Sequence, residues 1–291
     1  MSEAISGIDH LLIAVRDLDR AAASYRRLGF TLSPRAVHSA HMGTANHTIM
    51  LERDYFELLT VLAPTPANAK WRQALAEGDG LAGFAAATPS AAAAGAAWRA
   101  AGLAASHSLA FSRAVERADG KWMEARFEVV TLPEQTVPAM ALFACAQLTR
   151  DAVWLPELMT HPNTARAIRK LTIAVPDPLL AAESWSRALP GSTQELTEEG
   201  RQVGIGAHLV EYLDPAAAAR RYGLAQPIER GRALAIEFEV VDVDACREAL
   251  LRGGVTPQHQ GEATIVGGED THGVFISFLP NRMPSSSKAS A

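Results

Sequence analysis

The chain has 291 residues, a formal net charge of -5 and 48% hydrophobic residues, an ordinary balance for a globular protein of one or two domains. No basic block is present to neutralise phosphates, so the composition argues against nucleic acid as a partner. The longest apolar stretches, such as Leu81–Ala87 and Ala139–Ala146, are far shorter than the roughly 20 residues of a membrane span. Because the N-terminus also lacks a signal-peptide pattern, we expect a cytoplasmic protein with no membrane partner.

The N-terminal segment predicts one strand, one helix and three further strands. Ile8–Val15 is a short apolar run rich in β-branched residues, and Leu18–Leu28 carries apolar residues at helical spacing before Gly29. Turn-forming residues separate three more predicted strands, at Phe30–Ala36, Thr44–Leu51 and Tyr55–Leu62. The predicted order is therefore β-α-β-β-β.

The same order recurs in three further copies along the chain. The second copy comprises Leu81–Thr88, a helix at Ser90–Ala101, and strands at Leu109–Arg113, Met123–Val130 and Ala139–Cys145. The third comprises Ile168–Val175, a helix at Pro178–Leu189 and a last strand at Leu209–Leu213. The fourth comprises Leu234–Val241, a helix at Val243–Arg252 and a last strand at Val274–Leu279. A unit repeated in a fixed order is a fold-level signal, stronger than any single strand prediction.

The repeats divide the chain into two module pairs. We expect an N-terminal pair at residues 5–150 and a C-terminal, more degenerate pair at residues 167–282. A linker at residues 151–166 contains His161-Pro162-Asn163, and residues 283–291 form a Ser- and Ala-rich tail that we expect to be disordered. Four modules can complete two sites within one chain, so both a monomer and a homodimer are compatible with the sequence.

Several motifs resemble one known superfamily. GIDHLLIAVRDLDRAAASYRRLGF resembles the first strand and helix of vicinal-oxygen-chelate proteins, the superfamily of glyoxalases, bleomycin-resistance proteins and ring-cleaving dioxygenases. HMGTANHTIML, YFELLTV, CAQLTRDAVW and HPNTA resemble its glyoxalase-like subgroup. The resemblance implies an α+β fold of four βαβββ modules, paired into cup-shaped open barrels. In metal-dependent members, the first strand of a module supplies a His and its last strand a Glu, and both bind a divalent ion inside the cup.

His10 and Glu57 occupy these two positions in the first module and are the candidate catalytic residues and metal ligands. Glu57 lies in an apolar strand, where an unpaired carboxylate is costly to bury, so it should meet a metal, a hydrogen-bond donor or an arginine such as Arg35 or Arg53. A His and a carboxylate suit Zn, Mn, Fe or Ni, but two ligands do not define a metal site.

The other modules depart from the metal-binding pattern. The second has Gly83 and Phe143 at the two positions, the third Lys170 and Glu211, and the fourth Ala235 and Ser277. No pair therefore carries all four ligands, which leaves open whether any divalent metal binds. For Glu211, a salt bridge to Lys170 is the expected role.

A second group of polar or aromatic residues is predicted to contact a small-molecule substrate. The candidates are His41, Thr44, Asn46, Trp154, His161 and Asn163. For Asn46 and Trp154 a local turn or core packing is an equally good explanation. We expect the N-terminal cup to bind a small oxygen-rich metabolite and to transform it as a lyase, isomerase or dioxygenase. The alternative is a metal-free protein that binds or sequesters a small molecule on the same fold.

Overall fold

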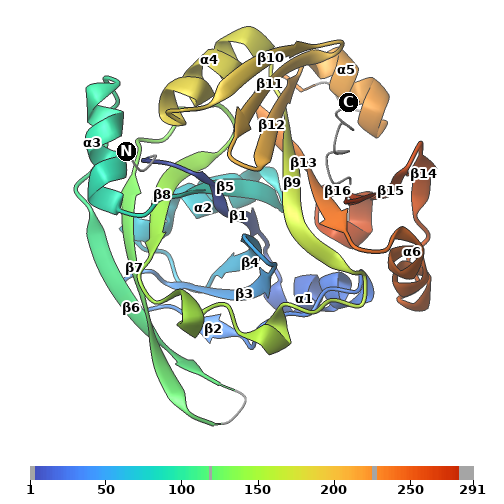
Figure 1. The fold of residues 1–291 in the computed structure, drawn as a ribbon, viewed down its shortest axis with the longest axis horizontal. Helices are drawn as coiled ribbons and strands as arrows, with labels where there is room; N and C mark the ends of the chain where they lie inside the picture. Colours follow the sequence, from blue (N-terminus) through green and yellow to red (C-terminus); the bar gives the residue numbers. More distant parts are fainter. Residues whose placement is uncertain (1–3, 118–119, 225–227, 282–291) are drawn as a thin grey trace, which may run out of the picture.

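A computed structural model of the protein describes residues 4–117, 120–224 and 228–281. Its strands form two eight-stranded sheets, and both curl around a concave face (Figure 1). The strand order is β2-β3-β4-β1-β5-β8-β7-β6 in the N-terminal sheet and β10-β11-β12-β9-β13-β16-β15-β14 in the C-terminal sheet. We call the two concave faces the N-terminal cup and the C-terminal cup. The tail predicted at residues 283–291 lies outside the described residues.

Each sheet is built from two βαβββ modules, which confirms the predicted fold class. The first module holds β1 (Gly7–Ala14), α1 (Leu18–Arg27), β2 (Ala36–Val37), β3 (Thr44–Met50) and β4 (Tyr55–Val61). The second holds β5 (Gly80–Ala87), α3 (Ala91–Ala100), β6 (Leu109–Glu116), β7 (Trp122–Thr131) and β8 (Ala141–Gln147). The third holds β9 (Ala165–Ala174), α4 (Pro178–Ala188), β10 (Thr193–Thr197), β11 (Gly200–Ile205) and β12 (His208–Leu213). The fourth holds β13 (Arg232–Val240), α6 (Val243–Arg252), β14 (Gln258–Gln260), β15 (Ala263–Val266) and β16 (Phe275–Pro280).

The same pairing rule builds both sheets. Within a module the first strand runs parallel to the last strand, as β1 does to β4 and β9 to β12. The two modules of a pair then join through their first strands, β1 with β5 and β9 with β13, which run antiparallel. Alternate residues of each strand therefore face the cup, and the others face the layer of helices and the other half of the chain.

Both sheets contribute to one buried hydrophobic cluster on the side away from the cups. Aromatic side chains from both halves meet there, with ring centroids 5.2 Å apart for Phe56 and Phe238 and 5.0 Å apart for Phe84 and Trp185. A buried polar bridge adds to this junction, because Asp54 accepts hydrogen bonds from the backbone N–H of Ile168 at 2.9 Å and from Nε2 of His208 at 3.0 Å. The two halves thus share a core.

Two helices that the sequence patterns do not predict pack into the cups. Helix α2 (Ala69–Glu77) follows β4 and lies inside the curl of the N-terminal sheet (Figure 1), where Trp71 packs against Leu12 and Leu59. Helix α5 (Pro215–Tyr222) follows β12 and packs in the same way in the C-terminal cup, through Ala217 and Ala218. Each helix therefore occupies part of its cup.

One predicted strand is wrong over most of its length. Of Phe30–Ala36, only Ala36 belongs to a strand. The backbone N–H of Thr31 donates to Nδ1 of His161 at 3.0 Å instead of to a neighbouring strand. Pro34 has no N–H to donate, so the segment cannot continue a hydrogen-bonded ladder.

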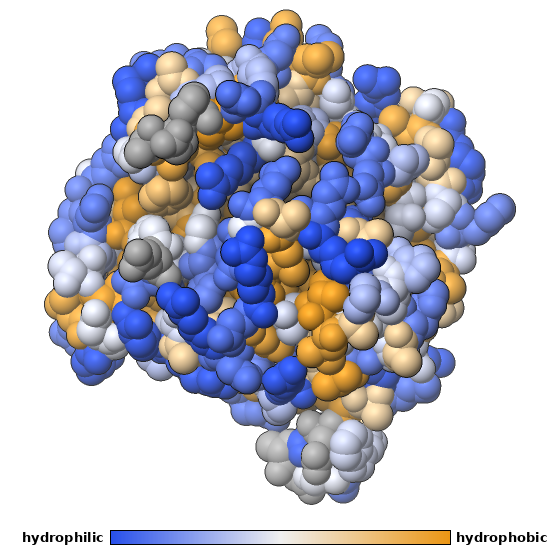
Figure 2. Space-filling model, turned by 180° about the vertical axis from the view of Figure 1, so that it is seen from behind, coloured by the Kyte–Doolittle hydropathy of each residue, from blue (hydrophilic) through white to orange (hydrophobic). Residues whose placement is uncertain are grey.

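None of the helices in the described part of the chain is long and apolar enough to cross a bilayer. The face seen in Figure 2 is mainly hydrophilic, with apolar side chains in short bands between the charged ones.

Candidate functional site

His10 lies on β1 beside a β-bulge. The pairing of β1 with β5 shifts register between Ile8 and His10, which leaves Asp9 as an extra residue. Such a bulge redirects side chains, and here both Asp9 and His10 reach the N-terminal cup. Nδ1 of His10 donates to Oδ2 of Asp9 at 2.7 Å, and the Gln147 amide donates to the same Asp9 oxygen at 2.9 Å. The bulge therefore adds a carboxylate to the site, which strict strand alternation would have directed away from the cup.

Aromatic rings hold the His10 imidazole in place. It stacks on Tyr55 with a centroid separation of 4.4 Å and meets the edge of Phe143 at 5.5 Å. Trp154 in turn packs edge-on against Tyr55 at 5.5 Å, and its Nε1 donates to the backbone oxygen of Leu51 at 3.0 Å. The predicted Trp154 thus lies in the aromatic wall behind His10.

Glu57 lies on β4 and faces the same cup. Only 7% of its surface is exposed, and Nδ2 of Asn46 on β3 donates to its Oε2. Neither arginine proposed as a partner reaches it, because Arg35 pairs with Asp19 at 3.5 Å and Arg53 pairs with Glu239 at 3.0 Å. Among the described residues, Glu57 has no ion pair.

The polar side of the cup near Glu57 includes two further predicted residues and one that the sequence patterns missed. Oδ1 of Asn46 is buried and has no hydrogen-bond partner among the described residues. The Thr44 hydroxyl hydrogen-bonds Nδ1 of His38 at 2.7 Å. Burial lowers the pKa of His38; the charge of Glu57 opposes this shift, and that of Arg113 adds to it. His38 therefore lies close enough to Glu57 and Arg113 to sense both charges.

Three predicted substrate-binding residues lie apart from this group. His41 is exposed in the turn before β3. His161 accepts a hydrogen bond from the Thr31 backbone at Nδ1 and donates from Nε2 to the Met50 backbone oxygen at 2.8 Å. The Asn163 side chain donates to the Leu28 backbone oxygen at 2.9 Å. The polar atoms of His161 and Asn163 are thus used to tie backbone segments together.

The strand register shows how far the N-terminal cup matches the family's metal-binding pattern. His10 pairs with Ala85, and Ala85 pairs with Phe143; in the same way Gly83 pairs with Leu12, and Leu12 pairs with Glu57. This symmetry confirms that Gly83 and Phe143 occupy the second module's two positions.

Neither of these two positions can supply a ligand. A Cβ added at Gly83 would lie 2.7 Å from Leu12 Cδ1 and 2.9 Å from Trp71 Cη2, so the indole already occupies the space of a side chain there. Phe143 offers no donor atom, and its ring lies 5.5 Å from the Lys70 ammonium. The residues present do not fit the four-ligand site of the metal-dependent members, and we assign no step to an ion held in that way.

The C-terminal cup is neutralised by its own side chains. The Lys170 ammonium lies 3.5 Å from the Glu211 carboxylate, as predicted, and Arg221 of α5 adds a contact at 2.6 Å. The Thr172 hydroxyl donates to the same carboxylate at 3.0 Å. Burial acts to raise the pKa of Glu211, but the charges of Lys170 and Arg221 outweigh it, so this pKa lies below its ordinary value.

Comparisons with known proteins fit this geometry. The family model of the glyoxalase-like domain matches residues 8–189, more than half of the chain. The chain belongs to the glyoxalase-like domain family. This assignment confirms the resemblance to the vicinal-oxygen-chelate superfamily. A search of curated proteins returned no match.

Solved structures share the whole architecture of this glyoxalase-like protein. A hypothetical protein from Staphylococcus aureus aligns with a TM-score of 0.68 at 11% identity, over 94% of this chain and 99% of the other. A mutant of 4-hydroxymandelate synthase from Streptomyces coelicolor aligns with a TM-score of 0.57 at 13% identity, over 96% and 93%. A fusion of a xylose isomerase-like TIM barrel and a 4-hydroxyphenylpyruvate dioxygenase aligns with a TM-score of 0.56 at 12% identity, over 99% of this chain and 51% of the fusion. At these identities the alignments show the fold alone.

Proposed function

We propose that this glyoxalase-like protein binds a small oxygen-rich metabolite in its N-terminal cup and transfers a proton on it, with Glu57 as the base. The observation that carries the proposal is the contrast between two equivalent carboxylates. Glu211 meets Lys170, Arg221 and Thr172, whereas among the described residues the Glu57 carboxylate has a hydrogen bond only from the Asn46 amide. A buried carboxylate without a cation costs stability, so its presence in only one of the two cups favours a chemical role.

The surroundings of Glu57 suit a small ligand with hydroxyl groups. His10 and Glu57 are only 6% and 7% exposed, so a macromolecule cannot reach them. The unpaired Oδ1 of Asn46 can accept a hydrogen bond from a ligand hydroxyl, and Arg113 supplies a positive charge near the cup. The rings of Tyr55 and Phe143 form an apolar wall. This combination of aromatic walls and a few polar groups is typical of small-molecule sites.

A second candidate function is binding without turnover. Trp71 and Phe143 fill the second module's half of the cup, where metal-dependent members place two ligands. A protein that sequesters a small molecule needs only the remaining half. The two candidates differ in whether Glu57 exchanges a proton with the bound compound.

The test begins with compounds that raise the melting temperature of the full chain, drawn from 2-hydroxy acids, 2-oxo acids, vicinal diols and catechols. Each hit is incubated in D2O with the protein, and deuterium uptake at carbon is followed by NMR. We expect uptake with the wild type and a loss of about 100-fold or more in Glu57→Gln, because a general base contributes roughly 10²–10⁴-fold. Glu211→Gln is the matched control from the other cup and should keep the exchange rate. Equal exchange in Glu57→Gln and the wild type would exclude Glu57 as the base. Ligand binding without any exchange would favour sequestration.

A further inference from the structure

Cys145 lies on β8 at the same end of the N-terminal cup as Asp9. Ala87 pairs with Gly7 on one side and with Cys145 on the other, so Cys145 is level with the beginning of β1. The bulge turns Asp9 into the cup two residues further along β1, between the levels of Ala86 and Ala85. Cys145 is also two residues beyond Phe143 and therefore faces the same side of β8.

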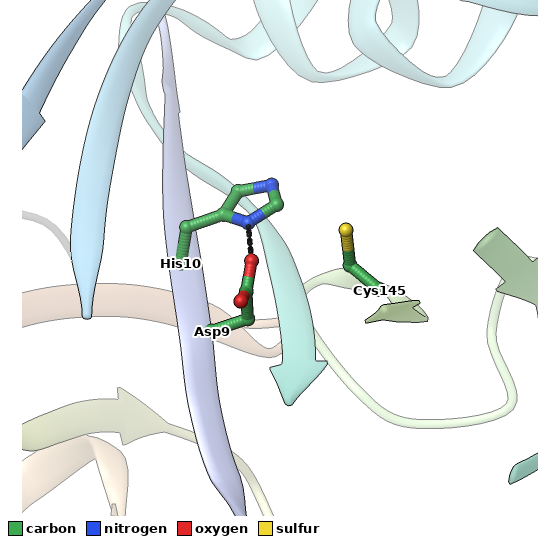
Figure 3. A group of neighbouring side chains, drawn as sticks. All are labelled: Asp9, His10 and Cys145. Atoms are coloured by element: carbon green, nitrogen blue, oxygen red, sulfur yellow. Dashed lines mark hydrogen bonds and ion pairs between the residues drawn. The ribbon is translucent and has the colours of Figure 1, made fainter. Parts of the chain in front are cut away.

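Small residues on the strand between them let these side chains meet. Strands β1 and β8 both flank β5, so their backbones are about 10 Å apart. The residues of β5 that face the cup here are Ala85 and Ala87, whose methyl groups leave room above the strand. One donor atom each from Asp9, His10 and Cys145 lies within 4.8 Å of the others, and all three residues are buried. Figure 3 shows the carboxylate, the imidazole and the thiol directed toward a common space.

We propose that Asp9, His10 and Cys145 bind a zinc ion. Carboxylate, imidazole and thiolate are all zinc ligands, and the thiolate selects against hard ions such as Mg²⁺ and Ca²⁺. One carboxylate and one thiolate together balance the charge of the ion, so the buried site is neutral when it is filled. The thiolate is the form that binds metal, so zinc binding releases the Cys145 proton.

The distances require only small side-chain movements. Ligand atoms that surround zinc at about 2.0–2.3 Å in a tetrahedron lie roughly 3.3–3.8 Å from one another. The three donor atoms here are within 4.8 Å of one another, and zinc binding would replace the 2.7 Å hydrogen bond between His10 Nδ1 and Asp9 Oδ2. The backbone positions are fixed by the sheet.

Two of the three side chains, Asp9 and Cys145, open onto a pocket. A cavity of about 470 Å³ is lined by Asp9 and Cys145 together with Gln147 and Arg150. Oε1 of Gln147 is buried and has no hydrogen-bond partner among the described residues. The Arg150 guanidinium, 3.5 Å from the centroid of the Trp154 ring, places a positive charge at this cavity. Three protein ligands and an open position are typical of catalytic zinc sites, and Arg150 would suit an anionic group on the molecule that fills the fourth position.

This set differs from the metal site that the family pattern implies. It keeps His10, replaces Glu57 with Asp9, and takes Cys145 from the second module in place of Gly83 and Phe143. The inference is also independent of the proposed function, because proton transfer by Glu57 does not require the ion.

The test uses Co²⁺ as a spectroscopic probe on the full chain after treatment with a chelator. A thiolate bound to Co²⁺ gives a sulfur-to-metal charge-transfer band in the near ultraviolet, which oxygen and nitrogen ligands alone do not give. We expect this band in the wild type at one Co²⁺ per chain, and its disappearance when Zn²⁺ is added. The matched control is Cys246→Ser, which removes the other cysteine, buried on α6, and should keep the band.

The variants separate the two metal sets. Cys145→Ser should lose the band, and Asp9→Asn should weaken Zn²⁺ binding by more than the roughly 10–100-fold that the loss of an outer partner causes. Glu57→Gln should keep the band, whereas a site built on His10 and Glu57, which supply only nitrogen and oxygen, would give no such band even in the wild type. A wild type that shows no charge-transfer band overturns the proposal without any need for a variant to fold. A band that survives in Cys145→Ser but is lost in Cys246→Ser also overturns it.

Discussion

Gly83 shows most directly how the N-terminal cup is filled, and its replacement by Ala is the first prediction. A glycine in a strand interior normally costs roughly 0.5–1 kcal/mol relative to alanine, so an unobstructed Gly→Ala change would stabilise the protein. Here the new methyl would lie 2.7 Å from Leu12 Cδ1 and 2.9 Å from Trp71 Cη2. Overpacking of this kind costs about 1–3 kcal/mol. We therefore expect Gly83→Ala to lower the free energy of unfolding by about 1–2 kcal/mol.

The assay is urea denaturation followed by circular dichroism, which does not depend on the fluorescence of Trp71. Trp71→Leu alone should destabilise the protein, because the indole is only 4% exposed. When Gly83→Ala is introduced into the Trp71→Leu background, its penalty should vanish, giving a coupling free energy of about 1 kcal/mol or more. If Gly83→Ala stabilises the wild type, or if its effect is the same in both backgrounds, then Trp71 does not fill the second module's position.

Two further predictions concern buried polar groups. Glu211→Gln should cost about 2 kcal/mol at pH 7, because it removes the charged hydrogen bonds of Glu211 while Lys170 and Arg221 keep their contacts with Glu237 and Glu199. Because folding lowers the pKa of Glu211, its contribution to the free energy of unfolding is present above the unfolded pKa of about 4.3 and is lost as the pH falls through the folded pKa. The difference in unfolding free energy between variant and wild type, measured by urea titration, should therefore close in acid. A difference that stays constant with pH would contradict this. His161→Ala should cost at least about 2 kcal/mol because it strands the Thr31 N–H and the Met50 carbonyl. Burial lowers the pKa of His161, so the wild type should lose stability as the pH falls below about 6.5. If the stability of His161→Ala falls with pH as steeply as that of the wild type in this range, His161 does not have this role.

Most of the fold could be predicted because each βαβββ module leaves a strong local pattern. A short apolar run, a segment with helical spacing and a glycine within a few residues of the helix end recur with each copy. The elements that escaped prediction lack such a pattern. Helix α5 buries Ala217 and Ala218 and helix α2 buries Trp71, and both lie outside the repeated βαβββ order from which the other helices were predicted. The exposed strand β10 shows no alternation of buried and exposed residues.

The candidate site could be predicted only as far as strand alternation holds. Glu57 and Asn46 face the cup because each lies on a regular strand at the expected parity, and His10 faces it because β1 resumes its alternation after the bulge. Asp9 was missed because a bulge reverses its direction, and a bulge depends on pairing with a strand some 70 residues further along the chain. The proximity of Cys145 to Asp9 and His10 depends on β1 and β8 flanking β5, which no local pattern shows. The roles of His161 and Asn163 depend on backbone atoms of Leu28, Thr31 and Met50, which no local pattern relates to them.

The central claim is that the two equivalent cups differ in function, and that the N-terminal one binds the ligand. The most direct measurement is a pair of backbone amide NMR spectra of the isotope-labelled chain, with and without a compound found in the melting-temperature screen. We predict chemical-shift changes at Asn46, Glu57 and their strand neighbours, with none at Thr172 and Glu211. Shifts that appear in the C-terminal cup, or that spare β3 and β4, would contradict the account.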